Sequence, residues 1–336
     1  MNRIPSLDGL RAYSVALVVL GHLATRQVTP SRFGVYAGFG VEVFFVISGF
    51  IITRILLLEH ESTGFISRAR FYKKRFFRIV PAAYLYIGAI LATHWHQFSF
   101  TNIATALSFT VNYDIHRQPV AAHLWSLGVE EQFYLLWPLI LVAFFRQRTK
   151  ILVTALCLSP FMPHLLRYFT WTAPYADFSF LAQYDLLALG CLGAVLYNRL
   201  PALRSPWLLL CGVAAVLFRW PLWAIPGLER LSALGHLWPL AHLCLAAFVL
   251  HVTHHRYVLL NLAPVVWLGT ISYGIYLWQQ VFILSPVPQW APLFTLMAAC
   301  VSYYGMERPL MRRYRRGSSS LARGKPGELA SAAGAN

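Results

Sequence analysis

The chain has 336 residues, of which 58% are hydrophobic, 15% are aromatic and only 12% are charged. Its mean hydropathy of +0.55 is far above that of a soluble domain. This composition excludes an ordinary soluble protein and predicts a polytopic membrane protein. The formal net charge of +16 does not indicate nucleic-acid binding. The Lys and Arg residues are spread along the chain and are not gathered on one soluble module.

Ten apolar runs are long enough to cross a bilayer, which takes about 17 to 25 residues in a helix. They lie near Leu10–Thr29, Tyr36–Leu58, Ile79–Trp95, His123–Phe145, Ile151–Phe169, Phe178–Tyr197, Pro206–Trp223, His236–Thr253, Leu259–Leu284 and Val287–Met306. The run Ile103–Val111 is too short to cross and is expected at the outer interface or between neighbouring spans. The sequence therefore predicts an all-α bundle of about ten transmembrane helices, with residues 1–315 as one membrane domain.

Charge along the chain predicts the orientation of this bundle. With the N-terminus inside, 22 of the 28 Lys and Arg residues fall in inner segments, so the positive-inside rule places both termini in the cytoplasm. The segment from Gly64 to Pro81 mixes aromatic and basic residues and is expected to form an amphipathic helix on the inner surface. Residues 316–336, rich in Gly, Ser and Ala, are expected to form a disordered cytoplasmic tail.

The first apolar run carries Arg11 and His22. These residues interrupt the run, which is therefore read as a retained span and not as a cleaved signal. Eleven helical residues bring the two side chains to one face, about 16 Å apart along the axis. Ionisable residues inside a span indicate function, and His22 lies past the midplane toward the outer side. The alternatives are a hydrogen-bonded core histidine and an arginine that reaches the lipid headgroups.

Four acids fall at a depth similar to that of His22: Glu42, Glu130, Glu131 and Asp185. Together they predict a polar chamber, and the alternative is ordinary polar contacts between helices. Glu130 and Glu131 point about 100° apart, so at most one can face His22. We expect Glu130 to do so. Trp137 lies seven residues later and near the same helix face, where it would form an aromatic wall beside the carboxylate.

Arg75 and Arg78 lie one helical turn apart at the inner surface, a spacing that suits two phosphate oxygens. On spacing alone, an anchor for anionic lipids or a plain topology signal is the favoured interpretation of these two arginines. No metal site is predicted, because the closely spaced histidine pairs lack further ligands: His94 with His96, and His254 with His255.

These motifs make the chain resemble the integral-membrane acyltransferase family 3, whose bacterial members O-acylate surface glycans such as lipopolysaccharide or peptidoglycan. The matching motifs are Leu7-Asp-Gly-Leu-Arg11 with His22, Gly40–Phe50 ending in Ile47-Ser-Gly-Phe50, Arg75-x-x-Arg78 before Pro81, Leu124-Trp-Ser-Leu127 with Glu130 and Glu131, Ser272-Tyr-Gly-Ile-Tyr-Leu277, and Ser302-Tyr-Tyr-Gly-Met-Glu-Arg-Pro-Leu310. Gln279 departs from the pattern, because similar members often carry histidine there. The resemblance is to the membrane-only subtype.

The resemblance implies a donor, an acceptor and a location. The donor would be cytoplasmic acetyl-CoA or another acyl-CoA, which acts as a substrate and not as a bound cofactor. The acceptor would be a hydroxyl of a cell-surface or lipid-linked saccharide, and the protein would lie among the lipids of the bacterial inner membrane. The rival interpretation is a transporter of glycolipid or of a small anion, since an ionisable chamber with inner arginines also suits alternating access.

The resemblance also implies residue roles. Arg75, Arg78 and Arg11 would hold the phosphates of the donor, because guanidinium forks fit phosphate oxygens well. His22 would act as the general base or as a transient acyl carrier, and Glu130 would orient its imidazole. The residues expected to contact the substrates are Trp125, Glu131, Glu42, Asp185 and Tyr276.

Overall fold

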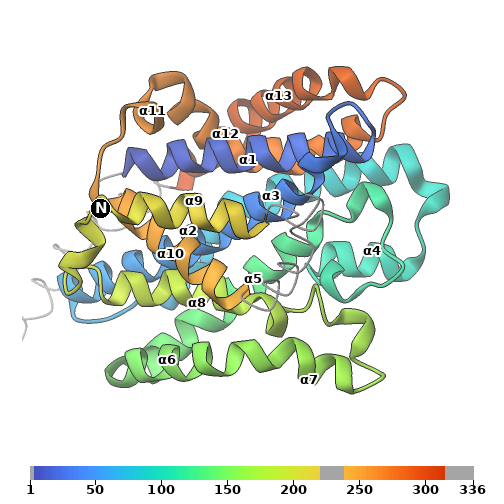
Figure 1. Ribbon diagram of the computed structural model, residues 1–336. Coiled ribbons are helices and arrows are strands. Elements are labelled where there is room, and N and C mark those ends of the chain that lie inside the picture. The colour runs from blue at the N-terminus through green and yellow to red at the C-terminus, as the bar shows by residue number, and fades with distance from the viewer. Residues whose placement is uncertain (1–3, 220–237, 315–336) are drawn as a thin grey trace, which may run out of the picture.

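The computed structural model describes residues 4–219 and 238–314. All regular structure in these two ranges is helical, as the sequence predicts (Figure 1). The predicted tail at 316–336 lies outside the described residues. So do the ends of two predicted spans, residues 220–223 and 236–237.

The helices run back and forth beside one another (Figure 1). The longer ones are α1 (Pro5–Thr25), α2 (Val35–Thr63), α3 (Arg68–His94), α5 (Leu124–Ala143), α8 (Phe180–Val195), α9 (Leu208–Arg219), α10 (Trp238–His254), α12 (Ala263–Ile283) and α13 (Ala291–Ser302). Shorter helices are α4 (Phe100–Leu107), α6 (Arg148–Leu158), α7 (Met162–Tyr168) and α11 (Val258–Asn261). A π-helical turn, Tyr303–Glu307, continues α13 toward Tyr314.

Five stretches of the described chain are long and apolar enough to cross a membrane: Ser6–Thr25, Tyr36–Thr63, Arg68–Gln97, Phe145–Tyr168 and Ala173–Val195. A shorter apolar helix covers Pro239–His254. The protein is therefore a polytopic helical membrane protein. The larger number of about ten spans, with both termini in the cytoplasm, stays a prediction.

We call the end of the bundle where α2 ends and α3 begins the basic end, because Arg68, Arg70 and Lys73 lie there. Helix α1 also begins at this end, which is on the left in Figure 1, and α4 lies at the opposite end. The eight residues of α4 form a helix about 12 Å long, too short to cross a bilayer. This agrees with the prediction that the run Ile103–Val111 does not span.

Two pairs of glycines let helix backbones touch. A Cβ at Gly9 of α1 would lie 1.9 Å from the carbonyl oxygen of Leu260, and one at Gly269 of α12 would lie 1.7 Å from that of Asp8. Gly49 of α2 and Gly190 of α8 make a matching close approach between those two helices. Small residues allow such contacts in membrane bundles. The glycines therefore fix α11 and α12 against α1, and α8 against α2, which sets the position of the polar groups those helices carry.

The structure corrects the prediction of a separate amphipathic helix from Gly64 to Pro81. The basic segment is the first half of α3, which continues through Pro81 to His94 as one helix. A proline removes one backbone hydrogen bond, but helices within a membrane bundle tolerate that loss when their neighbours hold them in place. The consequence is functional: Arg75 and Arg78 stand on a helix that enters the bundle and do not lie flat on its surface.

Candidate active site

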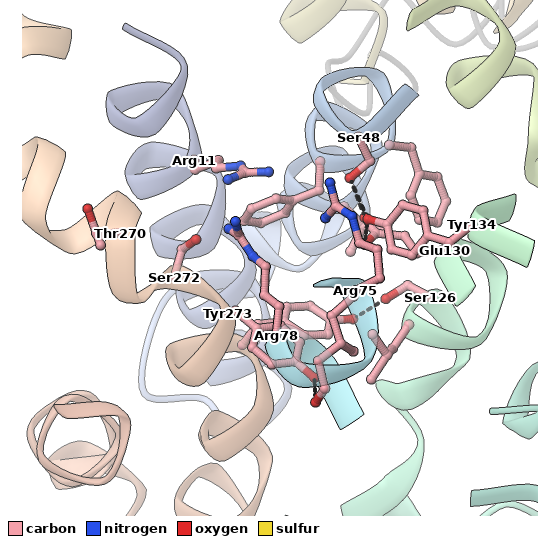
Figure 2. Close-up of a pocket in the computed structure, with 16 residues that line it drawn as sticks. Arg11, Ser48, Arg75, Arg78, Ser126, Glu130, Tyr134, Thr270, Ser272 and Tyr273 are labelled. Carbon is pink, nitrogen blue, oxygen red and sulfur yellow. Dashed lines mark hydrogen bonds between the residues drawn. The ribbon is translucent and has the colours of Figure 1, made fainter. Parts of the chain in front are cut away.

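A pocket lies between α1, α2, α3, α5 and α12 (Figure 2). We call it the cationic pocket, because three arginines from two helices line it. Its lining residues are Arg11, Val41, Phe44, Phe45, Ser48, Arg75, Arg78, Ile79, Ser126, Leu127, Glu130, Tyr134, Thr270, Ser272, Tyr273 and Tyr276.

The guanidinium groups of Arg11, Arg75 and Arg78 point into the same space (Figure 2). Arg75 is held between two aromatic rings, with its guanidinium carbon 5.7 Å from the ring centre of Phe71 and 5.1 Å from that of Tyr134. Such cation–π contacts fix the direction of a guanidinium group. The structure thus brings together the three arginines that the sequence assigned to donor phosphates, although Arg11 comes from a different helix.

Glu130 supplies a carboxylate to this pocket. Its Oε1 accepts a hydrogen bond of 3.0 Å from the Ser48 hydroxyl, and its Oε2 accepts one of 2.8 Å from the Tyr134 hydroxyl. Figure 2 shows the carboxylate on the Arg75 side of the pocket. Three guanidinium groups therefore face one lining carboxylate, and the surplus of positive charge makes the pocket a site for an anion.

The imidazole of His22 lies outside the residues that line the pocket and has a different partner. Its Nδ1 is 3.3 Å from Oε1 of Gln279 on α12. This corrects the expectation that Glu130 orients His22, because the side chain that meets the imidazole is Gln279, whereas the oxygens of Glu130 accept hydrogen bonds from Ser48 and Tyr134. The catalytic role of Glu130 stays a prediction.

A second imidazole, that of His123, meets α12 two residues before Gln279. His123 is buried, and its Nε2 donates a hydrogen bond of 3.0 Å to the carbonyl oxygen of Leu277. We call His22, Gln279 and His123 the imidazole cluster. The sequence alone predicts no role for His123 or for the glutamine at position 279.

Tyr276 and Ser126 connect the two regions. The Tyr276 hydroxyl donates to the carbonyl oxygen of His123 at 2.8 Å and is 2.5 Å from the Ser126 hydroxyl. Both residues line the pocket. Gln279 lies three residues after Tyr276 in α12, so the imidazole cluster begins about one helical turn, roughly 4.5 Å, beyond this edge of the pocket.

The predicted single chamber is wrong, because two of its acids belong elsewhere. Asp185 Oδ2 is 2.5 Å from Nδ1 of His242, and Glu42 Oε1 is 3.8 Å from Nε2 of the same ring. Glu42 precedes Ser48 by six residues, which places the two side chains about 120° apart around α2. Helix periodicity thus turns Glu42 toward α8 and α10 while Ser48 faces the pocket.

Of the residues expected to contact substrates, Tyr276 lines the pocket and the others do not. Trp125 packs against the rings of Phe45 and Phe178, at 6.1 and 5.2 Å between ring centres. Glu131 lies outside the lining residues, as the 100° separation from Glu130 requires.

The aromatic residue beside Glu130 is Tyr134 and not Trp137, a further correction. Trp137 instead donates its Nε1 hydrogen to the Thr53 hydroxyl at 2.8 Å, which links α5 to α2. Tyr134 is detectable in the sequence, because it lies four residues after Glu130 and therefore on the same face of the helix.

The helical membrane bundle gathers three arginines around an internal pocket, with an imidazole about one turn beyond, an arrangement that suits an anion beside a group able to accept a proton. Comparison with known proteins identifies the family. The chain belongs to the acyltransferase 3 family, whose acyltransferase-domain model matches residues 4–305. No solved structure matches the chain.

The curated relatives described next are bacterial proteins. The chain is 30% identical to the peptidoglycan O-acetyltransferase OatA of Listeria monocytogenes, over 85% of this chain and 50% of that protein. It is 29% identical to the putative peptidoglycan O-acetyltransferase YrhL of Bacillus subtilis, over 91% of this chain and 55% of the relative. It is 26% identical to the O-acetyltransferase OatA of Staphylococcus aureus, over 92% of this chain and 57% of that protein. The chain spans about half the length of these curated relatives.

Proposed function

We propose that the protein transfers an acyl group, in the first instance acetyl, from acyl-CoA to a hydroxyl of a cell-surface or lipid-linked saccharide. The observation that carries this proposal is the convergence of Arg11, Arg75 and Arg78 in one pocket of a chain that belongs to the acyltransferase 3 family. Acyl-CoA fits such a pocket, because its phosphates are anions and guanidinium groups bind phosphate oxygens through two parallel hydrogen bonds.

The donor would enter at the basic end. Arg78 is the most exposed of the three arginines, whereas Arg11 and Arg75 are half-buried, so the positive charge leads from the surface into the bundle. The phosphates would rest on the guanidinium groups, and the extended pantetheine arm would carry the thioester past Tyr276 toward the imidazole cluster.

The reaction would use the Nε2 atom of His22 as the base. A sugar hydroxyl is too weakly acidic to attack a thioester unaided, so His22 accepts its proton as the oxygen–acyl bond forms. The carbon–sulfur bond then breaks, and the proton passes from His22 to the thiolate, which leaves as free CoA. In the alternative route, Nε2 of His22 attacks the thioester and the CoA thiolate leaves, which forms a transient acyl-imidazole. The sugar hydroxyl then attacks the acyl carbon, the nitrogen–acyl bond breaks as the ester forms, and the hydroxyl proton passes to the freed Nε2 and on to the thiolate.

The acceptor to test first is peptidoglycan or its lipid-linked precursor. Two of the relatives named above are described as peptidoglycan O-acetyltransferases, one of them putatively. The bacterial relatives and the predicted orientation support a location in the bacterial inner membrane, with the basic end facing the cytoplasmic donor pool. Both termini would then be cytoplasmic, and about ten helices would span.

The proposal is tested with purified protein in liposomes, given acetyl-CoA labelled in the acetyl group and a peptidoglycan precursor. We expect label in an alkali-labile ester on the saccharide together with release of free CoA thiol. Movement of the saccharide or of an anion across the liposome membrane without ester formation would instead identify a transporter. The matched negative control is the His22→Gln protein, and the positional control is His96→Gln, which changes an exposed histidine at the opposite end.

A further inference from the structure

The imidazole of His22 is held by an amide at the position where the resemblance leads one to expect another histidine. Gln279 is completely buried, and its Oε1 lies 3.3 Å from Nδ1 of His22. The two residues are 257 positions apart in the chain, and they meet across the pair α1 and α12, whose backbones touch where Gly269 of α12 lies against Asp8 of α1. The contact is therefore built between two helices that are packed closely together.

A carbonyl-type oxygen only accepts hydrogen bonds, so its partner must donate. With Oε1 of Gln279 facing the ring, Nδ1 of His22 carries the hydrogen and Nε2 keeps its lone pair. In a neutral imidazole one nitrogen is a donor and the other an acceptor, and the hydrogen bond of one nitrogen decides the role of the other. Gln279 thereby selects the tautomer in which Nε2 is the basic, nucleophilic atom.

The surroundings of this pair are those of a site and not only of a packing contact. Two buried polar atoms of the imidazole cluster, Nε2 of Gln279 and Nδ1 of His123, have no hydrogen-bond partner among the described residues. Buried polar atoms are nearly always paired, and exceptions call for a functional account. One donor and one acceptor left open beside His22 suit a region that receives a polar substrate group.

Several ionisable groups lie on the elements packed around His22. Just before α5, the neighbouring group is His123, whose Nε2 donates a hydrogen bond to the Leu277 carbonyl oxygen. On α2 and α10, Glu42 and His242 face one another at 3.8 Å. On α12, the group in contact is the Gln279 amide, which does not titrate.

We propose that Gln279 is a positioning residue, which fixes His22 in the Nδ1–H tautomer and so presents Nε2 for acyl transfer. The proposal rests on the function proposed above. It replaces the carboxylate that the sequence predicted for this role with a neutral amide, and it makes a specific statement about which nitrogen carries the hydrogen.

Two substitutions separate this role from a structural one. Gln279→Leu removes the acceptor, so we expect kcat to fall roughly 10- to 100-fold, as for loss of other groups that orient an imidazole. The KM for acetyl-CoA should not change, because the cationic pocket is untouched. Gln279→Glu keeps an acceptor but adds a charge that favours the imidazolium form. We therefore expect the pH of half-maximal transfer to rise by about one to three units, with activity recovering at high pH.

The control is Gln132→Leu, which makes the same change of side chain at another position and is measured in the same assays. Gln132 donates to the Phe109 carbonyl and to the Asn112 amide oxygen, so its loss should lower the yield of folded protein without changing the pH profile. A Gln279→Leu protein with wild-type kcat per folded molecule, or a Gln279→Glu protein with the wild-type pH profile, overturns the proposal.

A tautomer measurement makes the test independent of the proposed reaction. In protein labelled with ¹⁵N at histidine, the His22 signals are assigned by their loss in His22→Gln. We expect hydrogen on Nδ1 in the wild type and in Gln279→Glu, and a mixture of tautomers in Gln279→Leu. Hydrogen on Nε2 in the wild type refutes the positioning role even if the protein is an active acyltransferase. A wild type with the expected tautomer but without acyl transfer refutes the proposed function alone.

Discussion

The cationic pocket and the imidazole cluster lie about one helical turn apart, yet they differ in every electrostatic respect. The pocket holds three guanidinium groups around one lining carboxylate, and it reaches the surface of the basic end at Arg78. The imidazole cluster consists of two imidazoles and an amide, with Gln279 and His123 fully buried or nearly so. The surplus of positive charge in the pocket needs a bound anion to balance it, whereas the neutral, buried imidazoles of the cluster are suited to exchanging protons.

The difference teaches how one bundle can hold a charged donor and still perform proton transfer. Guanidinium groups near an imidazole oppose its protonation, and water around it would compete for the acyl group. A spacer one helical turn long, formed by Tyr276 and Ser126, keeps the imidazole apart from the guanidinium groups. Donor binding and proton transfer thereby fall to different groups of residues. Substitutions in the cationic pocket should change the KM, and substitutions in the imidazole cluster should change kcat.

The sharpest test of this division is His22→Gln, for which we expect the largest effect. Loss of a general base costs typically 10²- to 10⁴-fold in rate. The fall should appear in kcat, while the affinity for acetyl-CoA, measured by calorimetry on purified protein, stays at the wild-type value. Near-normal transfer by the inserted variant would remove His22 from the mechanism, and weakened donor binding would contradict the separation of the two regions.

Arg75→Lys and Arg78→Lys test the other side of the comparison. Lysine keeps the charge but not the two-pronged geometry, and Arg75 would also lose its place between Phe71 and Tyr134. A lost charge-assisted hydrogen bond costs about 1.5 to 3 kcal/mol, so we expect the KM for acetyl-CoA to rise roughly 10- to 100-fold with a smaller change in kcat.

The matched control for these arginines is Arg70→Lys, on the same helix and outside the pocket, where the exposed side chain pairs with Glu59. It should leave the KM at the wild-type value. If all three lysine variants behave alike, the arginines at 75 and 78 serve only as a surface anchor.

Glu130→Gln should give an intermediate effect, and Glu131→Gln a small one. The amide offers one oxygen in place of two, so either Ser48 or Tyr134 loses its acceptor and the ring beside Arg75 is less firmly held. One lost hydrogen bond to a buried group is worth about 1 kcal/mol, which raises the KM for acetyl-CoA roughly 5-fold. Glu131 does not line the pocket, and its substitution should change the KM less than 2-fold, about 0.4 kcal/mol. A shifted pH profile of transfer in Glu130→Gln would instead support the original prediction that Glu130 contacts His22.

The sequence predicted the helical class and the pairing of Arg75 with Arg78, because both follow from local patterns: apolar length and a spacing of three. It did not predict which residue meets His22. That contact depends on how closely α1 approaches α12, where Gly269 lets the backbone of α12 meet Asp8 from the opposite end of the chain. Depth alone grouped Glu42 and Asp185 with Glu130, whereas the rotation of α2 and α8 directs them to His242. Helical periodicity fixes relative directions within a helix but not the neighbour that each face meets.

Tyr134→Phe is the finest test, because it removes one hydroxyl from the lining of the cationic pocket and nothing else. The ring 5.1 Å from the Arg75 guanidinium remains, and Glu130 keeps the Ser48 hydroxyl as a donor. A net hydrogen bond of about 0.5 kcal/mol corresponds to roughly a 2-fold rise in the KM for acetyl-CoA, with kcat unchanged. Tyr134→Leu also removes the cation–π contact, worth about 0.5 to 2 kcal/mol, and should raise the KM several-fold further. Equal KM values in the two variants would show that the ring does not position Arg75, and a fall in kcat in Tyr134→Phe would show that the hydroxyl serves the imidazole cluster as well as the pocket.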